Sequence, residues 1–170
     1  MNGAGREQGL CWDVNRIKLG AINQTKGAQM AYTSFEREGF EAFRNNDRPG
    51  PIHMLNLVLL RDQAIYEDGT MATGAEAYAS YGRLSAPVLA RVGGRIVWRG
   101  AMEQMLIGPQ DKMWDICFIA EYPKPGAFVE MLKDAEYRAA MAHRQAAVLD
   151  SRLIRMKPMM VGAAFGDPAG

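Results

Sequence analysis

The sequence predicts an α+β fold, in which a four-stranded antiparallel sheet has its helices packed on one face. Strand-like and helix-like segments follow one another in the order strand, helix, strand, strand, helix, strand, which is the split β-α-β arrangement. The chain has 170 residues, of which 48% are apolar and 23% charged, so it has enough apolar material for one packed domain. An additional helix is expected before the first strand.

The first predicted elements are a short helix and a central strand. Ser34 is placed to cap a helix whose apolar side consists of phenylalanines. Residues 45–51 are Asn-Asn-Asp-Arg-Pro-Gly-Pro, a run of turn-forming types that ends this helix. Residues 52–60 are apolar on both faces, which is typical of a strand covered on both sides.

The middle of the chain predicts a long helix followed by further strands. Residues 74–92 carry aromatic and apolar side chains at helical spacing. Pro87 lacks a backbone donor, so it is expected to kink or restart this helix. After the Gly93-Gly94 stop we expect strand over residues 95–98, a bend or bulge over 99–101, more strand over 102–107 and another strand over 114–122.

The last predicted elements are two helical segments and a strand. Helical turns are expected over residues 126–132, and Asp134 is placed to cap a second segment over 135–148. The last strand is expected over residues 151–156. One face of the sheet is then left without helices, and its strands are too apolar to face water. We therefore expect a homodimer, in which a second copy covers that face with its own sheet.

The ends of the chain differ from this domain. Residues 1–29 have a net charge of +2, contain five glycines and show no sustained period of 3.6 or 2. We expect them to be an irregular extension outside the domain, and hypothesise that they lie upstream of the physiological start. The domain is expected over residues 30–158 and an irregular tail over 159–170.

Composition and missing motifs exclude several functional classes. A net charge of +1 provides no positive electrostatic field that would attract nucleic acid. The sequence has no run of about 20 apolar residues and no signal peptide, so it predicts neither a membrane protein nor a secreted one. We expect a cytoplasmic protein. Two histidines, two cysteines and the absence of phosphate-loop, HExxH, CxxC and Gly-x-Ser-x-Gly motifs predict neither a metal site nor a tightly bound cofactor.

Several separated segments resemble one known family, in the right order. They are residues 50–57 (GPIHMLNL), 93–100 (GGRIVWRG), 134–138 (DAEYR), 143–147 (HRQAA) and 150–154 (DSRLI). Over roughly residues 33–158 the chain resembles the domain-of-unknown-function family 1330, within the dimeric α/β-barrel superfamily. The resemblance implies a ferredoxin-like subunit and a dimer whose two sheets form a barrel. Wider relatives include cofactor-independent monooxygenases, isomerases, lactone-handling enzymes, haem-dependent peroxidases and ligand-binding stress proteins, but the family itself has no agreed reaction.

Five residues are candidates for ligand binding. Tyr137 and Arg144 share one helical stripe, where a phenol and a guanidinium can face a carboxylate or enolate. The alternative is that Arg144 pairs with a carboxylate of the protein. Asn56 is the polar exception in an apolar strand and either bonds neighbouring backbone or orients a ligand. Tyr81 and Trp98 are either pocket walls or plain core.

His143 and Glu121 are the candidates for moving a proton. The alternatives are a solvated or capped His143 and a Glu121 paired with an arginine. These residues support three hypotheses. The first is a cofactor-independent enzyme of isomerase, lactone-processing or monooxygenase type that acts on an apolar oxygenated metabolite. The second is a non-catalytic ligand-binding or stress-related protein, and the third, weaker one is a haem-handling protein that uses a histidine as ligand.

Overall fold

A computed structural model describes residues 31–162 and residue 166 of the chain. The predicted extension over residues 1–29 and the greater part of the predicted tail lie outside the described residues. The elements, in chain order, are α1 (Arg37–Asn45), β1 (Ile52–Leu60), α2 (Gly74–Arg91), β2 (Arg95–Gly100), β3 (Ile116–Tyr122), α3 (Pro125–Lys133), α4 (Ala135–Ala147) and β4 (Val148–Met156).

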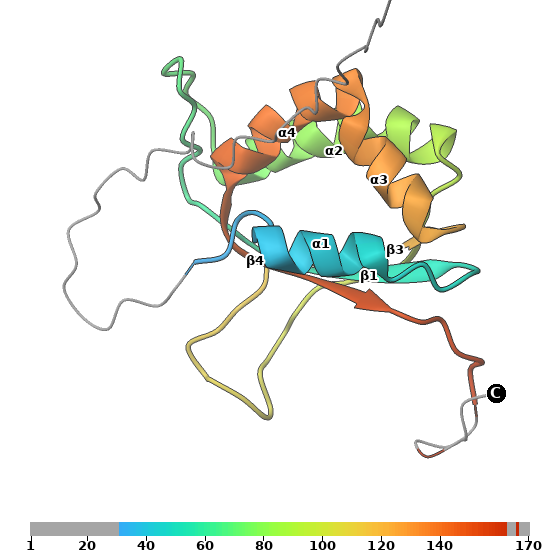
Figure 1. Cartoon of the computed structure of the whole chain (residues 1–170). Helices are drawn as coiled ribbons and strands as arrows, with labels where there is room; N and C mark the ends of the chain where they lie inside the picture. Colours follow the sequence, from blue (N-terminus) through green and yellow to red (C-terminus); the bar gives the residue numbers. More distant parts are fainter. Residues whose placement is uncertain (1–30, 163–165, 167–170) are drawn as a thin grey trace, which may run out of the picture. The chain divides into compact units, whose positions relative to one another are not determined.

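The strands form one antiparallel sheet in the order β2-β3-β1-β4. Figure 1 shows α2, α3 and α4 together on one side of this sheet, and no described helix covers the other side. The predicted α+β, ferredoxin-like fold is therefore confirmed. Among the described residues, none of the helices combines the length and apolarity that crossing a membrane requires.

The register assigns each strand residue to one of the two faces. Met54 pairs with Ala120 and Asn56 with Phe118, and these positions face the helices. On this face of β1, Ile52, Met54 and Val58 are at most 3% exposed. The intervening positions point to the second face, which we call the open face. Its central side chains are Leu55, Leu57, Trp98, Cys117, Ile119 and Ile154.

The core lies between the sheet and the helices. Phe128 of α3 is 4% exposed and packs edge-on against the rings of Tyr122 and Phe43, with ring centroids 5.3 Å away in both pairs. Phe43 belongs to α1, so this ring cluster fixes α1 against the sheet and α3. α4 begins at the predicted cap, because the Asp134 side chain accepts hydrogen bonds from the backbone of Glu136 and Tyr137.

Two local predictions were wrong, and one of the two alternatives at Pro87 is excluded. The N-cap of α1 is Glu36 rather than Ser34, and no side chain caps the helix. The helix α2 does not restart at Pro87 but runs through it. The described residues 102–107 form no strand: β3 begins only at Ile116, whose neighbour Cys117 already pairs with Gly100, so the chain beyond Gly100 has no partner.

Candidate functional site

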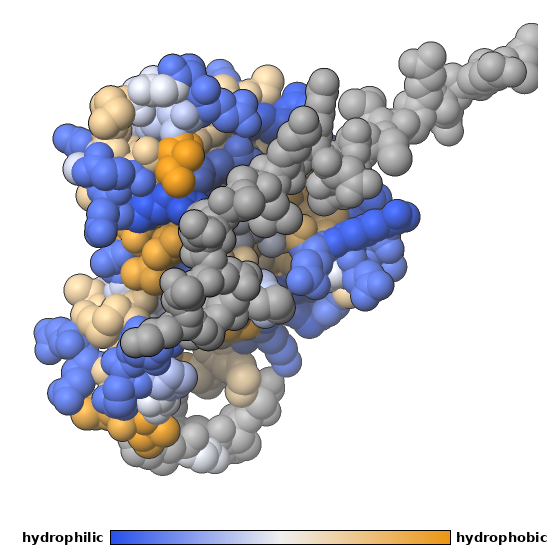
Figure 2. Space-filling view, turned by 90° about the vertical axis from the view of Figure 1, so that its left-hand side faces the viewer, coloured by the Kyte–Doolittle hydropathy of each residue, from blue (hydrophilic) through white to orange (hydrophobic). Residues whose placement is uncertain are grey.

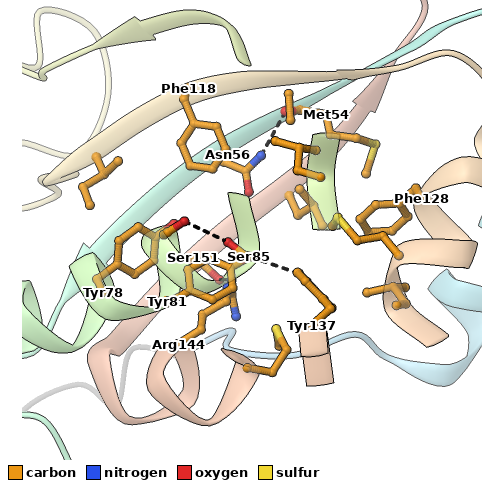
Figure 3. A pocket seen from close by; sticks show the side chains of 18 of the residues that line it. Met54, Asn56, Tyr78, Tyr81, Ser85, Phe118, Phe128, Tyr137, Arg144 and Ser151 are labelled. Carbon is orange, nitrogen blue, oxygen red and sulfur yellow. Dashed lines mark hydrogen bonds between the residues drawn. The ribbon is translucent and has the colours of Figure 1, made fainter. Parts of the chain in front are cut away.

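A cavity of about 790 Å³ lies between the helix-facing side of the sheet and helices α2, α3 and α4 (Figure 3). This volume is within the usual range for small-molecule sites. Figure 2 shows apolar surface in a hollow between the helix layer and the lower part of the molecule. The apolar lining includes Met54, Leu89, Ile96, Ile116, Phe118, Ala120, Phe128, Met131, Leu132, Met141 and Leu153.

Five tyrosines add hydroxyl groups to this lining: the exposed Tyr32 and the more buried Tyr78, Tyr81, Tyr122 and Tyr137. The hydroxyls of Tyr81 and Tyr137 lie 3.0 Å apart and share a hydrogen bond. The Tyr122 hydroxyl donates to the sulfur of Met131. Tyr78 lies on α2, and its hydroxyl has no hydrogen-bond partner among the described residues. The cavity therefore offers phenol groups embedded in an apolar surface.

The phenols of Tyr78, Tyr122 and Tyr137 stay protonated at neutral pH. Burial, with the neighbouring Tyr81, raises the pKa of Tyr137 well above its ordinary value. Burial likewise raises the pKa of Tyr122 and of Tyr78, although the charges of Arg144 and Arg99 lower that of Tyr78 in part. Protonated phenols are hydrogen-bond donors, so they suit a ligand that carries oxygen acceptors.

Arg144 projects from α4 into the wall of this cavity (Figure 3). Its Nη1 donates to the carbonyl of Thr33 at 2.9 Å and its Nη2 to the Ser151 hydroxyl at 3.2 Å. No carboxylate of the described residues pairs with it, so the expected alternative of an ion pair within the subunit is not what the structure shows. A guanidinium has five N–H donors, and two bonds leave three of them for a ligand.

Asn56 points from β1 into the cavity, as its place on the helix-facing side requires (Figure 3). Its amide nitrogen donates to the carbonyl of Met54 at 2.9 Å. The expected bond to neighbouring backbone is therefore present, and the other end of the amide is exposed to the cavity, whereas its role in orienting a ligand stays a prediction. The amide oxygen has no donor among the described residues.

The charged side chains of the described lining are all arginines: Arg99, Arg144 and Arg152. Asp150 neutralises Arg152 across 2.7 Å. Arg99, on β2, is exposed and has no hydrogen bond or ion pair with any described residue. The described lining contains no aspartate, glutamate, histidine, lysine or cysteine. The cavity is therefore apolar with an excess of positive charge.

The other predicted site residues lie elsewhere. The Nδ1 atom of His143 is 2.7 Å from the Tyr66 hydroxyl, and His143 does not line the cavity. Glu121 is on the open face, paired with Arg95 at 2.9 Å and with His53 at 3.0 Å. Hydrogen bonds from His53 and Arg95 lower the pKa of Glu121. The structure thus brings together Asn56, Tyr81, Tyr137 and Arg144 but neither proton-transfer candidate.

A bulge in β2 separates Trp98 from the cavity and brings in Arg99, which sequence reasoning missed. Ile96 pairs with Ala120 on the helix-facing side, but the register shifts before Trp98, which pairs with Ile119. Trp98 therefore faces the open side, and Arg99 opposite Phe118 faces the cavity. The sequence predicted a bend or bulge over residues 99–101 instead, and therefore did not predict the direction of either side chain.

The described residues offer neither a cluster of metal-binding side chains nor a histidine in the cavity lining. No group of three or more histidine, cysteine, aspartate or glutamate side chains in the described part of the chain is placed to hold a metal ion. Neither histidine lines the cavity, since His53 is on the open face and His143 is bound to Tyr66. A haem bound in this cavity would have no histidine ligand from its described lining.

Comparison with known families gives a match over residues 70–156, to the family described as a domain of unknown function, DUF1330. The chain belongs to the DUF1330 family. No curated protein matches this DUF1330 chain.

Solved structures similar to this DUF1330 protein include two of RPA0582. One, of the methylated protein, is 60% identical with a TM-score of 0.77 and covers 79% of this chain and 99% of that one. The second, of RPA0582 as a protein of unknown function from Rhodopseudomonas palustris, has 60% identity, a TM-score of 0.75 and coverage of 78% and 100%. A more distant match is SnoaB, a cofactor-independent oxygenase from Streptomyces nogalater, with 16% identity, a TM-score of 0.45 and coverage of 68% and 99%.

Proposed function

We propose that this DUF1330 protein binds an apolar, oxygenated small molecule in the cavity between its sheet and its helices. The observation that carries the proposal is the composition of that cavity: a largely apolar lining of about 790 Å³ into which a few polar groups converge. The phenol pair of Tyr81 and Tyr137, the Asn56 amide and the Arg144 guanidinium supply those groups. Arg144 and Asn56 retain hydrogen-bonding capacity that the described protein does not use.

A cofactor-independent enzyme of isomerase, lactone-processing or monooxygenase type is the second candidate, and Arg144 favours it. A guanidinium aimed into an apolar cavity stabilises an enolate or another anionic oxygen that forms during a reaction. The described lining contains no aspartate, glutamate, histidine, lysine or cysteine to accept a proton, and burial raises the pKa of the Tyr78, Tyr122 and Tyr137 phenols. For this reason simple ligand binding, as in a non-catalytic or stress-related protein, is the function that the geometry supports best.

Ligand binding is tested by filling the cavity. Ser85 lines it from α2 (Figure 3), so Ser85→Phe places a ring in the cavity. Ala79→Phe on the exposed side of the same helix is the matched control. Calorimetric titration with 2-naphthalenemethanol, 2-naphthamide and 2-naphthoate should show binding of at least one compound to the natural protein and the control, and its loss in Ser85→Phe. Equal binding by both variants, or no binding by any protein, would refute the proposal.

The enzyme candidate is tested on an enolisable ketone of the same shape. Deuterium exchange at the methyl group of 2-acetonaphthone, followed by NMR, measures enolate formation directly. Acceleration by the protein that decreases in Arg144→Gln supports an enzyme. An unaccelerated rate, with binding intact, assigns the cavity to binding alone.

We propose further that a second copy of the chain covers the open face, so that two sheets form an α/β barrel. Trp98 and Ile154 on this face are 50% and 45% exposed. The loop between β2 and β3, which carries the exposed Leu106 and Ile107, extends on the same side, away from α2, α3 and α4 (Figure 1). Apolar surface of this extent on one side favours association.

The dimer is tested with two variants of equal exposure. Ile154 on the open face and Leu84 on α2 are 45% and 44% exposed, so neither substitution disturbs the core. Light scattering should give a dimer for the natural protein and for Leu84→Asp, and a monomer for Ile154→Asp. A monomeric natural protein, or a dimer that Ile154→Asp leaves intact, would contradict association through this face.

A further inference from the structure

The charges around the cavity are strongly one-sided. Of the three arginines in its lining, Arg152 is neutralised by Asp150, whereas Arg99 and Arg144 have no carboxylate partner among the described residues. The described lining holds no acidic side chain at all. Removing a positive charge from water is costly unless an anion compensates it, and for the partly buried Arg144 the described protein supplies none.

The two uncompensated arginines line the same cavity as Tyr78. Both of their charges lower the pKa of the Tyr78 phenol, against the larger effect of burial. The Tyr78 hydroxyl also has no hydrogen-bond partner among the described residues. Figure 3 shows Tyr78 and Arg144 bordering the same space, with the Asn56 amide above it. A phenol donor and two guanidinium groups therefore border one cavity whose described lining contains no carboxylate.

Arg144 is held in place for such a contact. Its bonds to the Thr33 carbonyl and the Ser151 hydroxyl fix the plane of the guanidinium while leaving three N–H donors unused. Arg99 is exposed as well as lining the cavity, so it lies where the cavity meets solvent. Arg144 is thus preorganised inside the cavity, and Arg99 is available at the opening of the cavity.

We infer that Tyr78, Arg99 and Arg144 form an anion subsite, and that the natural ligand of the cavity is a carboxylic acid with an apolar, ring-sized body. A carboxylate is planar and presents two acceptor oxygens, which match the donor fork of a guanidinium. The aromatic and methionine side chains beyond the subsite suit the apolar body. The inference rests on the proposed function, since it names the ligand class of the same cavity.

The test compares two ligands of the same shape that differ in charge. Calorimetric titration near neutral pH uses 2-naphthoate and its neutral counterpart 2-naphthamide. The natural protein should bind the carboxylate about tenfold more tightly than the amide, and high salt should reduce this preference. Equal affinity, or a preference for the amide, overturns the anion subsite while leaving ligand binding established. Failure of both to bind while 2-naphthalenemethanol still binds also overturns the anion subsite, and failure of all three compounds contradicts the proposed function itself.

Three substitutions assign the preference to residues. Arg99→Gln and Tyr78→Phe should each reduce the affinity for 2-naphthoate about threefold to tenfold and change that for 2-naphthamide little. Arg83→Gln, which removes one positive charge from the exposed surface of α2 outside the cavity, is the matched control and should leave both affinities unchanged. If Arg83→Gln lowers the carboxylate affinity as much as Arg99→Gln, the preference comes from overall charge, and the subsite is refuted.

Discussion

The hydrogen bond between Tyr81 and Tyr137 allows a quantitative prediction about the wall of the cavity. The two hydroxyls lie 3.0 Å apart, and each is the other's partner among the described residues. Both tyrosines line the cavity, but Tyr137 is 5% exposed, whereas Tyr81 is only partly buried. Removing one hydroxyl therefore has different consequences according to which one remains.

The expected loss of stability in each variant depends on whether the remaining hydroxyl can find another hydrogen-bond partner. Tyr81→Phe leaves the Tyr137 hydroxyl buried without a partner, which should lower the free energy of unfolding by about 1–3 kcal/mol. Tyr137→Phe leaves the Tyr81 hydroxyl, which water in the cavity can reach, so its cost should be about 0.5–1.5 kcal/mol. In the double variant no polar group is left unpaired, and its cost should not exceed that of Tyr81→Phe alone.

Urea denaturation of the natural protein, the two single variants and the double variant completes a double-mutant cycle. The predicted coupling between the two positions is favourable, and Tyr81→Phe is the more destabilising single change. Additive costs would show that the two hydroxyls do not interact. A larger cost for Tyr137→Phe would show that Tyr81, not Tyr137, is the buried partner.

Three further predictions concern pH and packing. Burial raises the pKa of Tyr137 above its unfolded value of about 10, so its contribution to stability is fully present below about pH 10 and is lost as the pH rises through the folded pKa. Circular dichroism, which follows unfolding, and tyrosinate absorbance, which follows ionisation, should therefore change together for this residue. Ionisation well before unfolding would contradict its burial. Burial raises the pKa of Asp150, but hydrogen bonds from backbone amides and an arginine lower it by more, so the net shift is downward. The contribution of Asp150 to stability is therefore lost as the pH falls through that lowered pKa. Asp150→Asn, which leaves two cations unpaired, should cost about 2–4 kcal/mol in urea denaturation, and an unchanged midpoint would refute the network. A Cβ at Gly74 would collide with the carbonyl of Arg61, so Gly74→Ala should lower the free energy of unfolding by several kcal/mol. Gly82 has open space around it, so Gly82→Ala should raise that free energy by up to about 1 kcal/mol. Equal thermal midpoints for the two variants would contradict this packing.

The sequence predicted most of the fold because its signals are local. Residues 52–60 were expected as a strand and form β1 with those limits. Alternation in β3 was also informative, since Phe118 and Ala120 face the helices and Cys117 and Ile119 the open side. Residues 102–107 show why such signals fail elsewhere. Their apolar pattern suits a strand, but a strand needs a neighbour, and pairing cannot be read from a single segment.

The site was less predictable because its members meet only through tertiary structure. Arg144 and Tyr137 share a helical stripe that the sequence shows, and both line the cavity. His143 is the next residue to Arg144, yet it turns to Tyr66 in a loop that no local pattern associates with α4. Arg99 depends on the bulge in β2, because one extra residue exchanges the two faces of a strand.

A crystal structure of the protein soaked with 2-naphthoate tests the central claim most directly. The account predicts the naphthalene ring between sheet and helices, against Phe118 and Met54, with its carboxylate within hydrogen-bonding distance of Arg144 and Tyr78. A ligand bound on the open face or at the surface, with the cavity unoccupied at saturating concentration, would contradict it.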